Sequence, residues 1–433
     1  MIRIKPEMLQ LAGRLADVRR EALKTDGVKN WSRHHLISYE GGGYLTFMTS
    51  DNRIGVVSRL PVEGVDSPWS ATIVARPFDH IAKYVNGGAY ELDPCDAKVI
   101  VLRKVPFKYP LRRGEPGGPF PLLTAPPADE GSASFDPAVV ERALSLLMDS
   151  NKKRDDEGGL DFCSLFEDGL IAYSDGGVLW KARGPVLPSA IHLRRGDAFR
   201  AWEWLKALEA AEVTTTMHIA AVEKDGRWSI VFWSHDRAHL LQVRSAPRSF
   251  PRRAVDGPEY EVPTVCCDVD RDTLRRRAGM SCQAPSWKLD CEFATLEDGN
   301  HVFKARFDVA GKSGGRDQLE IENWQQAEEA QQLNSRFTVG SRNLERLLHR
   351  LTSSRVKIAF HQRAHCLSVT PVPDDGNDLD AGAVVGFLRT GVPEQDQDRT
   401  TAAPADAIDT KLPSAGETGT LEALPGPAPT QIS

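Results

Sequence analysis

Apolar residues recur at helical spacing in six segments of the chain, and most of the sequence between them alternates between apolar and polar positions. A recurrence at i, i+3, i+4 and i+7 predicts a helix with one buried face, whereas alternation predicts a strand. Asp136-Pro137, Asp197 and Ser341 are start signals for three of the helices. The positions that define the six helices are Met8, Leu11, Leu15, Val18 and Ala22; Phe78, Ile81, Ala82 and Val85; Val140, Ala143, Leu144 and Leu147; Phe199, Trp202 and Leu205; Leu274 and Ala278; and Leu344, Leu347, Leu348 and Leu351.

The body of the chain contains an internal repeat. Residues 235–243 read HDRAHLLQV and residues 361–369 read HQRAHCLSV, an offset of 126. Each segment lies between two runs typical of strands, which predicts a strand, a tight turn and a second strand. Weaker matches, of 44–54 with 169–178 and of 118–121 with 248–251, have offsets of 124 and 130. Because this period exceeds the roughly 20–50 residues of solenoid repeats, we expect three duplicated domains, at 1–127, 128–262 and 263–390.

Residues 391–433 differ in composition from the body. They contain six prolines, no aromatic residue, seven acidic residues and two basic ones, for a formal charge of −5. Such a segment has too little apolar surface to offset its ordering entropy, which predicts a disordered acidic tail.

Composition and charge narrow the class of protein. Hydrophobic residues make up 41% of the 433 residues and charged residues 26%, which is typical of a globular protein. The whole chain carries −6, so the first 390 residues carry about −1, and this argues against binding nucleic acid by bulk charge alone. No apolar run is long enough to span a membrane, and no signal sequence is evident. Seven cysteines without a CxxC pair predict neither disulfides nor a zinc knuckle, as expected for the cytoplasm.

Three segments resemble the landmarks of a known family in their order and spacing. Residues 174–179 read SDGGVL and are similar to the T-D-G-H-R-L turn of the bacterial DNA polymerase III β subunit, the sliding clamp. Residues 250–253 read FPRR and are similar to its F-P-D-Y-R-R segment, and residues 384–389 read VVGFLR and are similar to its closing strand, V-V-M-P-M-R. The chain departs from the family at Gly177, where the family has His, and at Gly386-Phe387, where it has Met-Pro. The resemblance covers roughly residues 1–390 and is that of a divergent member.

The resemblance implies a fold and a function. The fold would be α+β, with three repeated clamp-type domains of two helices on antiparallel sheets, and a homodimer would close into a ring. Such a ring encircles double-stranded DNA of any sequence and tethers the replicative polymerase as a processivity factor. It is not an enzyme and needs no cofactor or metal, and its protein partners are DNA polymerase and clamp-loader peptides.

Five clusters of basic residues lie on the predicted helices or at their ends. A mildly positive lining would suit a sliding protein, because weak phosphate contacts exchange quickly and carry no sequence information. Taken singly, each cluster is more typical of a solvated helix face with i,i+4 ion pairs, whereas five together favour a lining. The candidate DNA-facing residues are Arg14, Arg19, Arg20, Lys24, Lys29, Lys152, Lys153, Arg154, Arg200, Lys206, Arg275, Arg276, Arg277, Arg342, Arg346 and Arg350.

A second surface follows from the resemblance, because family members bind partner peptides between the middle and last domains. An apolar groove with a few polar rim atoms suits a short linear peptide. Ordinary core and edge-strand packing is the alternative for each matching position. The tail follows directly on the closing strand, and we hypothesise that it shields this pocket. The candidate pocket residues are Gly176, Gly177, Leu179, Pro251, Arg253, Val384, Val385, Phe387 and Leu388.

Other functions fit the pattern less well. His235 and His239, like His361 and His365, have HxxxH spacing, which on a helix would place two imidazoles together for zinc, but the surrounding pattern predicts hairpins. The sequence contains no Walker A motif, GxSxG elbow or strand-linked GxGxxG, which disfavours an enzyme. A clamp-like decoy or regulator of a replication complex, with the same fold but no encircled DNA, stays open as an alternative.

Overall fold

The structure is a computed structural model in which Met1–Gly391 form one compact unit. Apart from Gly391, which ends the last strand, the predicted tail lies outside the described residues. The described residues are 2–18, 33–51, 54–64, 67–94, 97–114, 123, 126, 131–147, 162–174, 178–213, 215–224, 227–246, 252, 263, 265–282, 288–295, 301–308, 316–322, 324–326, 335–361, 364–372 and 384–391.

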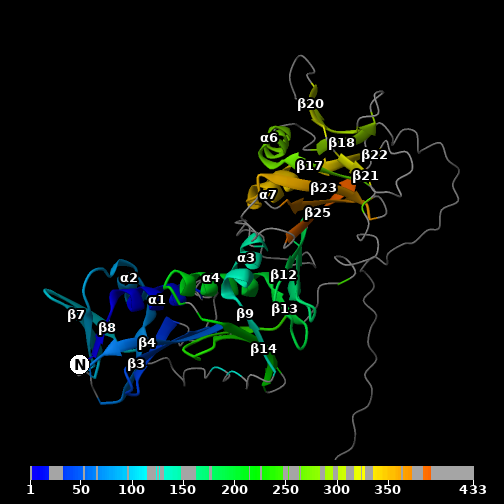
Figure 1. Cartoon of the computed structure of the whole chain (residues 1–433). Coiled ribbons are helices and arrows are strands. Elements are labelled where there is room, and N and C mark those ends of the chain that lie inside the picture. The colour runs from blue at the N-terminus through cyan, green and yellow to red at the C-terminus, as the bar shows by residue number, and fades with distance from the viewer. Residues whose placement is uncertain are drawn as a thin grey trace, which may run out of the picture. The chain divides into compact units, whose positions relative to one another are not determined.

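Two antiparallel sheets form the framework of the described chain (Figure 1). The first sheet has 12 strands: β1 (Ile2–Ile4), β2 (His34–Tyr39), β3 (Tyr44–Ser50), β4 (Ile54–Glu63), β5 (Trp69–Val74), β6 (Tyr90–Asp93), β7 (Val99–Lys104), β8 (Phe107–Arg112), β9 (Ala133–Phe135), β14 (Met217–Lys224), β15 (Arg227–Ser234) and β16 (His239–Arg244). The second sheet has 13 strands: β10 (Phe162–Leu165), β11 (Leu170–Ser174), β12 (Val178–Arg183), β13 (Ile191–Arg194), β17 (Val265–Asp270), β18 (Lys288–Thr295), β19 (His301–Asp308), β20 (Arg316–Glu322), β21 (Trp324–Gln326), β22 (Ser335–Gly340), β23 (Arg355–His361), β24 (Cys366–Pro371) and β25 (Val384–Gly391).

The middle third of the chain joins the two sheets. Its strands β9, β14, β15 and β16 continue the sheet of the first third, through pairing of β16 with β4. Its strands β10 to β13 continue the sheet of the last third, through pairing of β12 with β25. Backbone hydrogen bonds therefore run without interruption across both junctions between thirds.

Three pairs of helices pack against these sheets: α1 (Pro6–Asp17) with α2 (Ala75–Tyr84), α3 (Pro137–Leu147) with α4 (Arg195–Glu209), and α6 (Arg271–Ser281) with α7 (Ser341–Arg350). All six predicted helices are present in the described residues. Helix α1 ends at Asp17, and the predicted position Ala22 lies outside the described residues. Asp136 accepts a hydrogen bond from the Ala138 N–H (2.9 Å), the capping contact expected where α3 begins.

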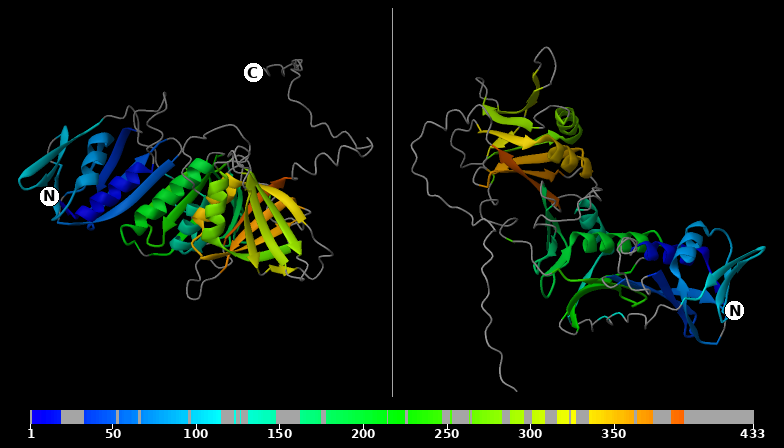
Figure 2. Two further views of the ribbon diagram at one scale, coloured as in Figure 1. Left: turned by 90° about the horizontal axis from the view of Figure 1, so that it is seen from above. Right: turned by 180° about the vertical axis from the view of Figure 1, so that it is seen from behind.

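The buried faces are those that the periodicity predicts. Leu344, Leu347 and Leu348 of α7 are buried against strands, as helical spacing requires, and α7 contacts both β22 and β25. Strand β2 alternates between partly and fully buried positions along its length. Two further views show the same layering of helices on sheets (Figure 2). The fold is therefore α+β with antiparallel sheets, as predicted.

Both segments of the clearest repeat form the predicted hairpin, with β15 pairing with β16 and β23 with β24. The two histidine motifs are nevertheless one residue out of register. β15 ends at Ser234 and β23 at His361, while β16 begins at His239 and β24 at Cys366. Equivalent strand ends are therefore offset by 127 residues, whereas the matching histidines are offset by 126. Each HxxxH motif thus has one histidine at the end of a strand, His239 or His361, and the matching histidines do not occupy equivalent positions.

Candidate functional site

Five arginines of the last helix pair are exposed or partly exposed, and together they are named the arginine face. The buried sides of α6 and α7 carry leucines and small residues instead. The Arg275 guanidinium donates to Nδ1 of His349 (3.1 Å), so the contact joins the two helices. The arginine face consists of Arg275, Arg276, Arg277, Arg342 and Arg346.

Positive charge on the described helices is concentrated in this pair. Helices α6 and α7 together carry seven arginines and two acidic residues. Helices α1 and α2 carry three basic and three acidic residues, and α3 and α4 carry four of each. A phosphate backbone brought near the three pairs would therefore be attracted chiefly to the last one.

Two predicted DNA-facing residues have other surroundings. The Arg200 side chain is only 6% exposed and forms an ion pair with Glu203 one turn along α4, so its charge is neutralised inside the protein. Arg350 stacks on the ring of Trp180 (5.4 Å from the guanidinium carbon), and burial lowers its pKa to about 10. Arg200 thus pairs within its own helix and Arg350 contacts Trp180 of β12, so the protein itself engages both guanidinium groups.

The remaining candidates divide into two groups. Arg14 on α1 and Lys206 on α4 are exposed, and the Lys206 ammonium lies 4.9 Å from the ring centre of Trp202. The others lie outside the described residues: Arg19, Arg20, Lys24, Lys29, Lys152, Lys153 and Arg154.

The predicted peptide pocket centres on the pairing of β12 with β25. Leu179 lies opposite Phe387, and Lys181 lies opposite Val385. Phe387 is also paired with Ser368 on β24. Directly paired positions share a face of an antiparallel sheet, so strands from the middle and last thirds contribute to one surface, named the junction surface.

The register separates the other two positions of the closing strand from this surface. Val384 is paired with Ala182 and Leu388 with Val178, and both partners are buried in the core. Successive residues of a strand alternate between its faces. Val384 and Leu388 are therefore paired with the strand row that alternates with that of Leu179, and their pocket role stays a prediction. Gly176, Gly177, Pro251 and Arg253 lie outside the described residues.

A small apolar cluster lies beside Leu179. Phe166 and Ala172 are buried there, and Leu170, Leu179 and Ala190 pack against them in part. The signal for this cluster was present in the sequence, because Ala172 and Leu170 alternate along β11 in step with Leu179 on the paired strand. The landmark segments include Leu179 but not Leu170 or Ala172, so the family resemblance does not point to these two residues.

Polar groups border the same cluster. Arg252, in the FPRR segment, stacks on Phe166 (5.4 Å) and forms an ion pair with Asp168 (2.6 Å). In the last third of the chain, His361 forms a hydrogen bond with the Ser368 hydroxyl (2.9 Å), and its pKa is lowered to about 4 by burial and by the nearby Lys181 ammonium. The apolar cluster thus includes Leu179, has Arg252 at its border, and lies beside the strand that pairs with β25.

Two strands that end the sheets carry opposite formal charge. β8 ends the first sheet with Lys108 and Arg112 and no acidic residue. β20 ends the second sheet and carries one arginine and three acidic residues. Phe107, at the start of β8, is 59% exposed. Unpaired strand edges with exposed apolar side chains are typical sites for pairing with another chain.

Neither a metal centre nor a membrane span is found among the residues that the structure describes. No cluster of three or more histidine, cysteine, aspartate or glutamate side chains has the arrangement of a metal site there. Within the same residues, no helix is long and apolar enough to cross a membrane.

Three helix pairs on continuous antiparallel sheets make up the described chain, and solved structures of β clamps match it. The β subunit of DNA polymerase III from Thermotoga maritima matches with a TM-score of 0.68 and 14% identity over 91% of this chain and 100% of its own. The β subunit from Pseudomonas aeruginosa matches with a TM-score of 0.66 and 14% identity over 90% and 99%. The Helicobacter pylori β clamp bound to a DNA ligase peptide matches with a TM-score of 0.62 and 10% identity over 91% and 100%.

No family model and no curated protein sequence matches the chain. The chain therefore has the sliding-clamp fold at very low sequence identity, and the resemblance noted in its sequence is confirmed at the level of the fold.

Proposed function

We propose that the protein is a sliding clamp that encircles duplex DNA and tethers a replicative polymerase, without catalytic activity of its own. The observation that carries the proposal is the arginine face, which combines with a fold shared with known clamps. Flexible arginines that contact phosphates hold DNA without reading its sequence, and their strength depends on salt.

The ends of the two sheets support the closure of a ring. A head-to-tail homodimer pairs β8 of one subunit with β20 of the other, so that basic and acidic strands meet twice. Backbone hydrogen bonds supply the affinity of such an interface, and the opposite charges set its partner and orientation. The exposed Phe107 is buried when the strands pair.

Partner peptides bind at the junction surface. The apolar cluster of Phe166, Ala172 and Leu179 accepts the apolar side chains of a polymerase or clamp-loader peptide, and Arg252 and Lys181 offer charged groups at its border. A related fold, the Helicobacter pylori β clamp, binds a DNA ligase peptide, which supports a peptide-binding role for this class.

One observation favours the alternative of a decoy or regulator that does not encircle DNA. Two of the three described helix pairs have no net charge, so fewer contacts hold DNA than in an evenly basic ring. Primer extension with the replicative polymerase and clamp loader of the source organism separates the two functions. A clamp lengthens the products of single binding events, whereas a decoy shortens those made with the resident clamp.

A further inference from the structure

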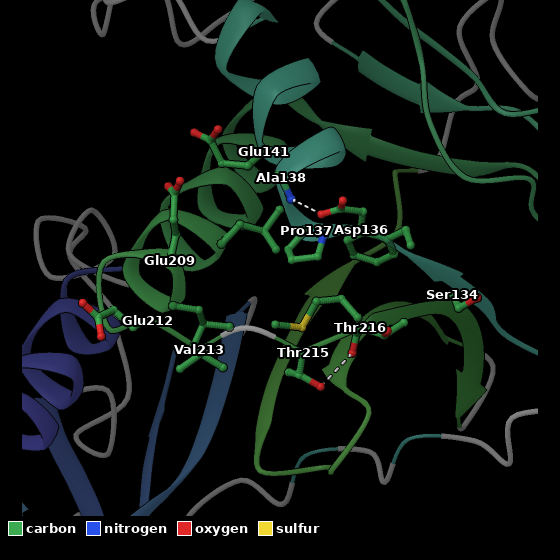
Figure 3. A pocket seen from close by; sticks show the side chains of 14 residues that line it. Ser134, Asp136, Pro137, Ala138, Glu141, Glu209, Glu212, Val213, Thr215 and Thr216 are labelled. Carbon is green, nitrogen blue, oxygen red and sulfur yellow. Dashed lines mark hydrogen bonds between the residues drawn. The ribbon is translucent and has the colours of Figure 1, made fainter. Parts of the chain in front are cut away.

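A cavity lies between the start of α3, the end of α4 and strands β9 and β14 (Figure 3), and its described lining shares no residue with the arginine face or the junction surface. Its volume is about 660 Å³, within the range of cavities that hold a ligand or several side chains. It is named the α3–α4 pocket, and its apolar lining consists of Phe135, Pro137, Leu205, Leu208, Val213 and Met217.

The border of the pocket is acidic. Glu141, Glu209 and Glu212 gather along one side of it, while Ser134 and Thr216 lie across (Figure 3). No lysine or arginine is among its described lining residues. Glu141 accepts a hydrogen bond from the indole N–H of Trp202 (2.7 Å), which fixes its carboxylate in place.

The end of α4 builds one wall of the pocket. The N–H of Val213 donates to the carbonyl of Leu208 (3.1 Å), and the N–H of Glu212 donates to the carbonyl of Glu209 (2.9 Å). This is the Schellman pattern, in which the residue after the helix is left-handed, and Glu212 has φ of 55°. The pattern holds Leu208 and Val213 together on the apolar wall.

The end of α4 departs from two residue preferences that are usual at the end of a helix. Glycine is the usual residue at the left-handed position, because a side chain is strained there, yet the chain has Glu212. The negative end of the helix dipole disfavours carboxylates, yet Glu209 and Glu212 both lie there. Sequences depart from local preferences mainly at functional or strained sites, and both departures here place a carboxylate beside the same apolar cavity.

We propose that the α3–α4 pocket binds a basic segment of a partner protein, which inserts one or two apolar side chains into the cavity and places lysine or arginine beside the carboxylates. An acidic border repels nucleic acid and also the acidic residues 392–433 of the chain itself. Opposite charge around an apolar anchor is the usual basis of partner choice at such a site. The site is independent of DNA encirclement and separate from the junction surface.

The test uses the full-length protein and fluorescence anisotropy. The probe is a labelled synthetic peptide with adjacent leucine and phenylalanine flanked by lysines. One comparison peptide has glutamate in place of lysine, and another has serine in place of the two apolar residues. We expect the first peptide to bind and both comparison peptides to bind at least tenfold more weakly.

Variants locate the binding. The double variant Glu209→Gln, Glu212→Gln should weaken the lysine peptide about tenfold at low salt, because each rim charge contributes modestly. Glu223→Gln, an exposed carboxylate on β14 outside the pocket, is the matched control and should have no effect. Equal binding by the double variant, or loss of binding in Leu179→Glu instead, would overturn the proposal, the latter by assigning the peptide to the junction surface.

Discussion

Replacement of two residues of the arginine face should flatten the salt dependence of DNA binding. Arg276 and Arg342 are the exposed members of the face, and the helices that carry them are anchored by buried leucines on their other sides. The double variant Arg276→Gln, Arg342→Gln therefore removes charge without removing core contacts. Each phosphate contact contributes about 0.9 to the slope of log K against log salt, so the loss should be about 1.8 for each subunit in contact with DNA.

Anisotropy of a labelled duplex at about 50 and about 200 mM NaCl measures this slope. If the slope is lower by about 1.8, the factor by which affinity falls between these two salt concentrations is about tenfold smaller for the double variant than for the unmodified protein. Arg244→Gln, at an exposed arginine on β16, is the control and should leave the slope unchanged. A double variant with the slope of the unmodified protein would refute the assignment of the arginine face to DNA.

Three further predictions concern stability. The folded protein keeps His361 neutral, with a pKa of about 4 against 6.5 for an exposed histidine, so stability should fall as pH drops below 6.5. Urea unfolding at pH 7 and pH 5 should differ by about 2 kcal/mol from this group, and His361→Gln should remove that difference. Glu212→Gly should raise the unfolding free energy by about 1 kcal/mol, measured in urea, since glycine suits its positive φ. Leu348→Ala should lower it by about 2–5 kcal/mol in the same assay, because the residue is fully buried.

The local periodicity of apolar residues predicts most of the helices and strands of the fold. Leu344, Leu347 and Leu348 recur at helical spacing because one side of a helix must be buried, and this spacing suffices to locate α7. The hairpin motifs are equally clear in the sequence, but the matching histidines have an offset one residue shorter than that of the strand ends. Side-chain identity and backbone register are separate properties, so a short sequence match does not fix register.

The composition of the junction surface depends on strand pairing between distant parts of the chain, which the sequence does not reveal. Whether Phe387 or Leu388 lies beside Leu179 depends on how β25 pairs with β12, some 200 residues away, and no local pattern specifies this. The sequence predicts Arg200 as part of a lining, because its spacing from Glu203 is common on solvated helices and does not reveal a buried ion pair. The α3–α4 pocket is lined by residues of α3, α4, β9 and β14, which are separated in the sequence, so no local pattern predicts it.

Topological linkage to DNA tests the central claim most directly. The protein is incubated with circular duplex DNA, its subunit contacts are closed with a chemical cross-linker, and the mixture is filtered in high salt, which removes electrostatic binding. If the protein encircles the duplex, cross-linked protein stays with the intact circle and is released when a restriction enzyme linearises it. Release from circular and linear DNA alike would contradict a ring that encircles the duplex.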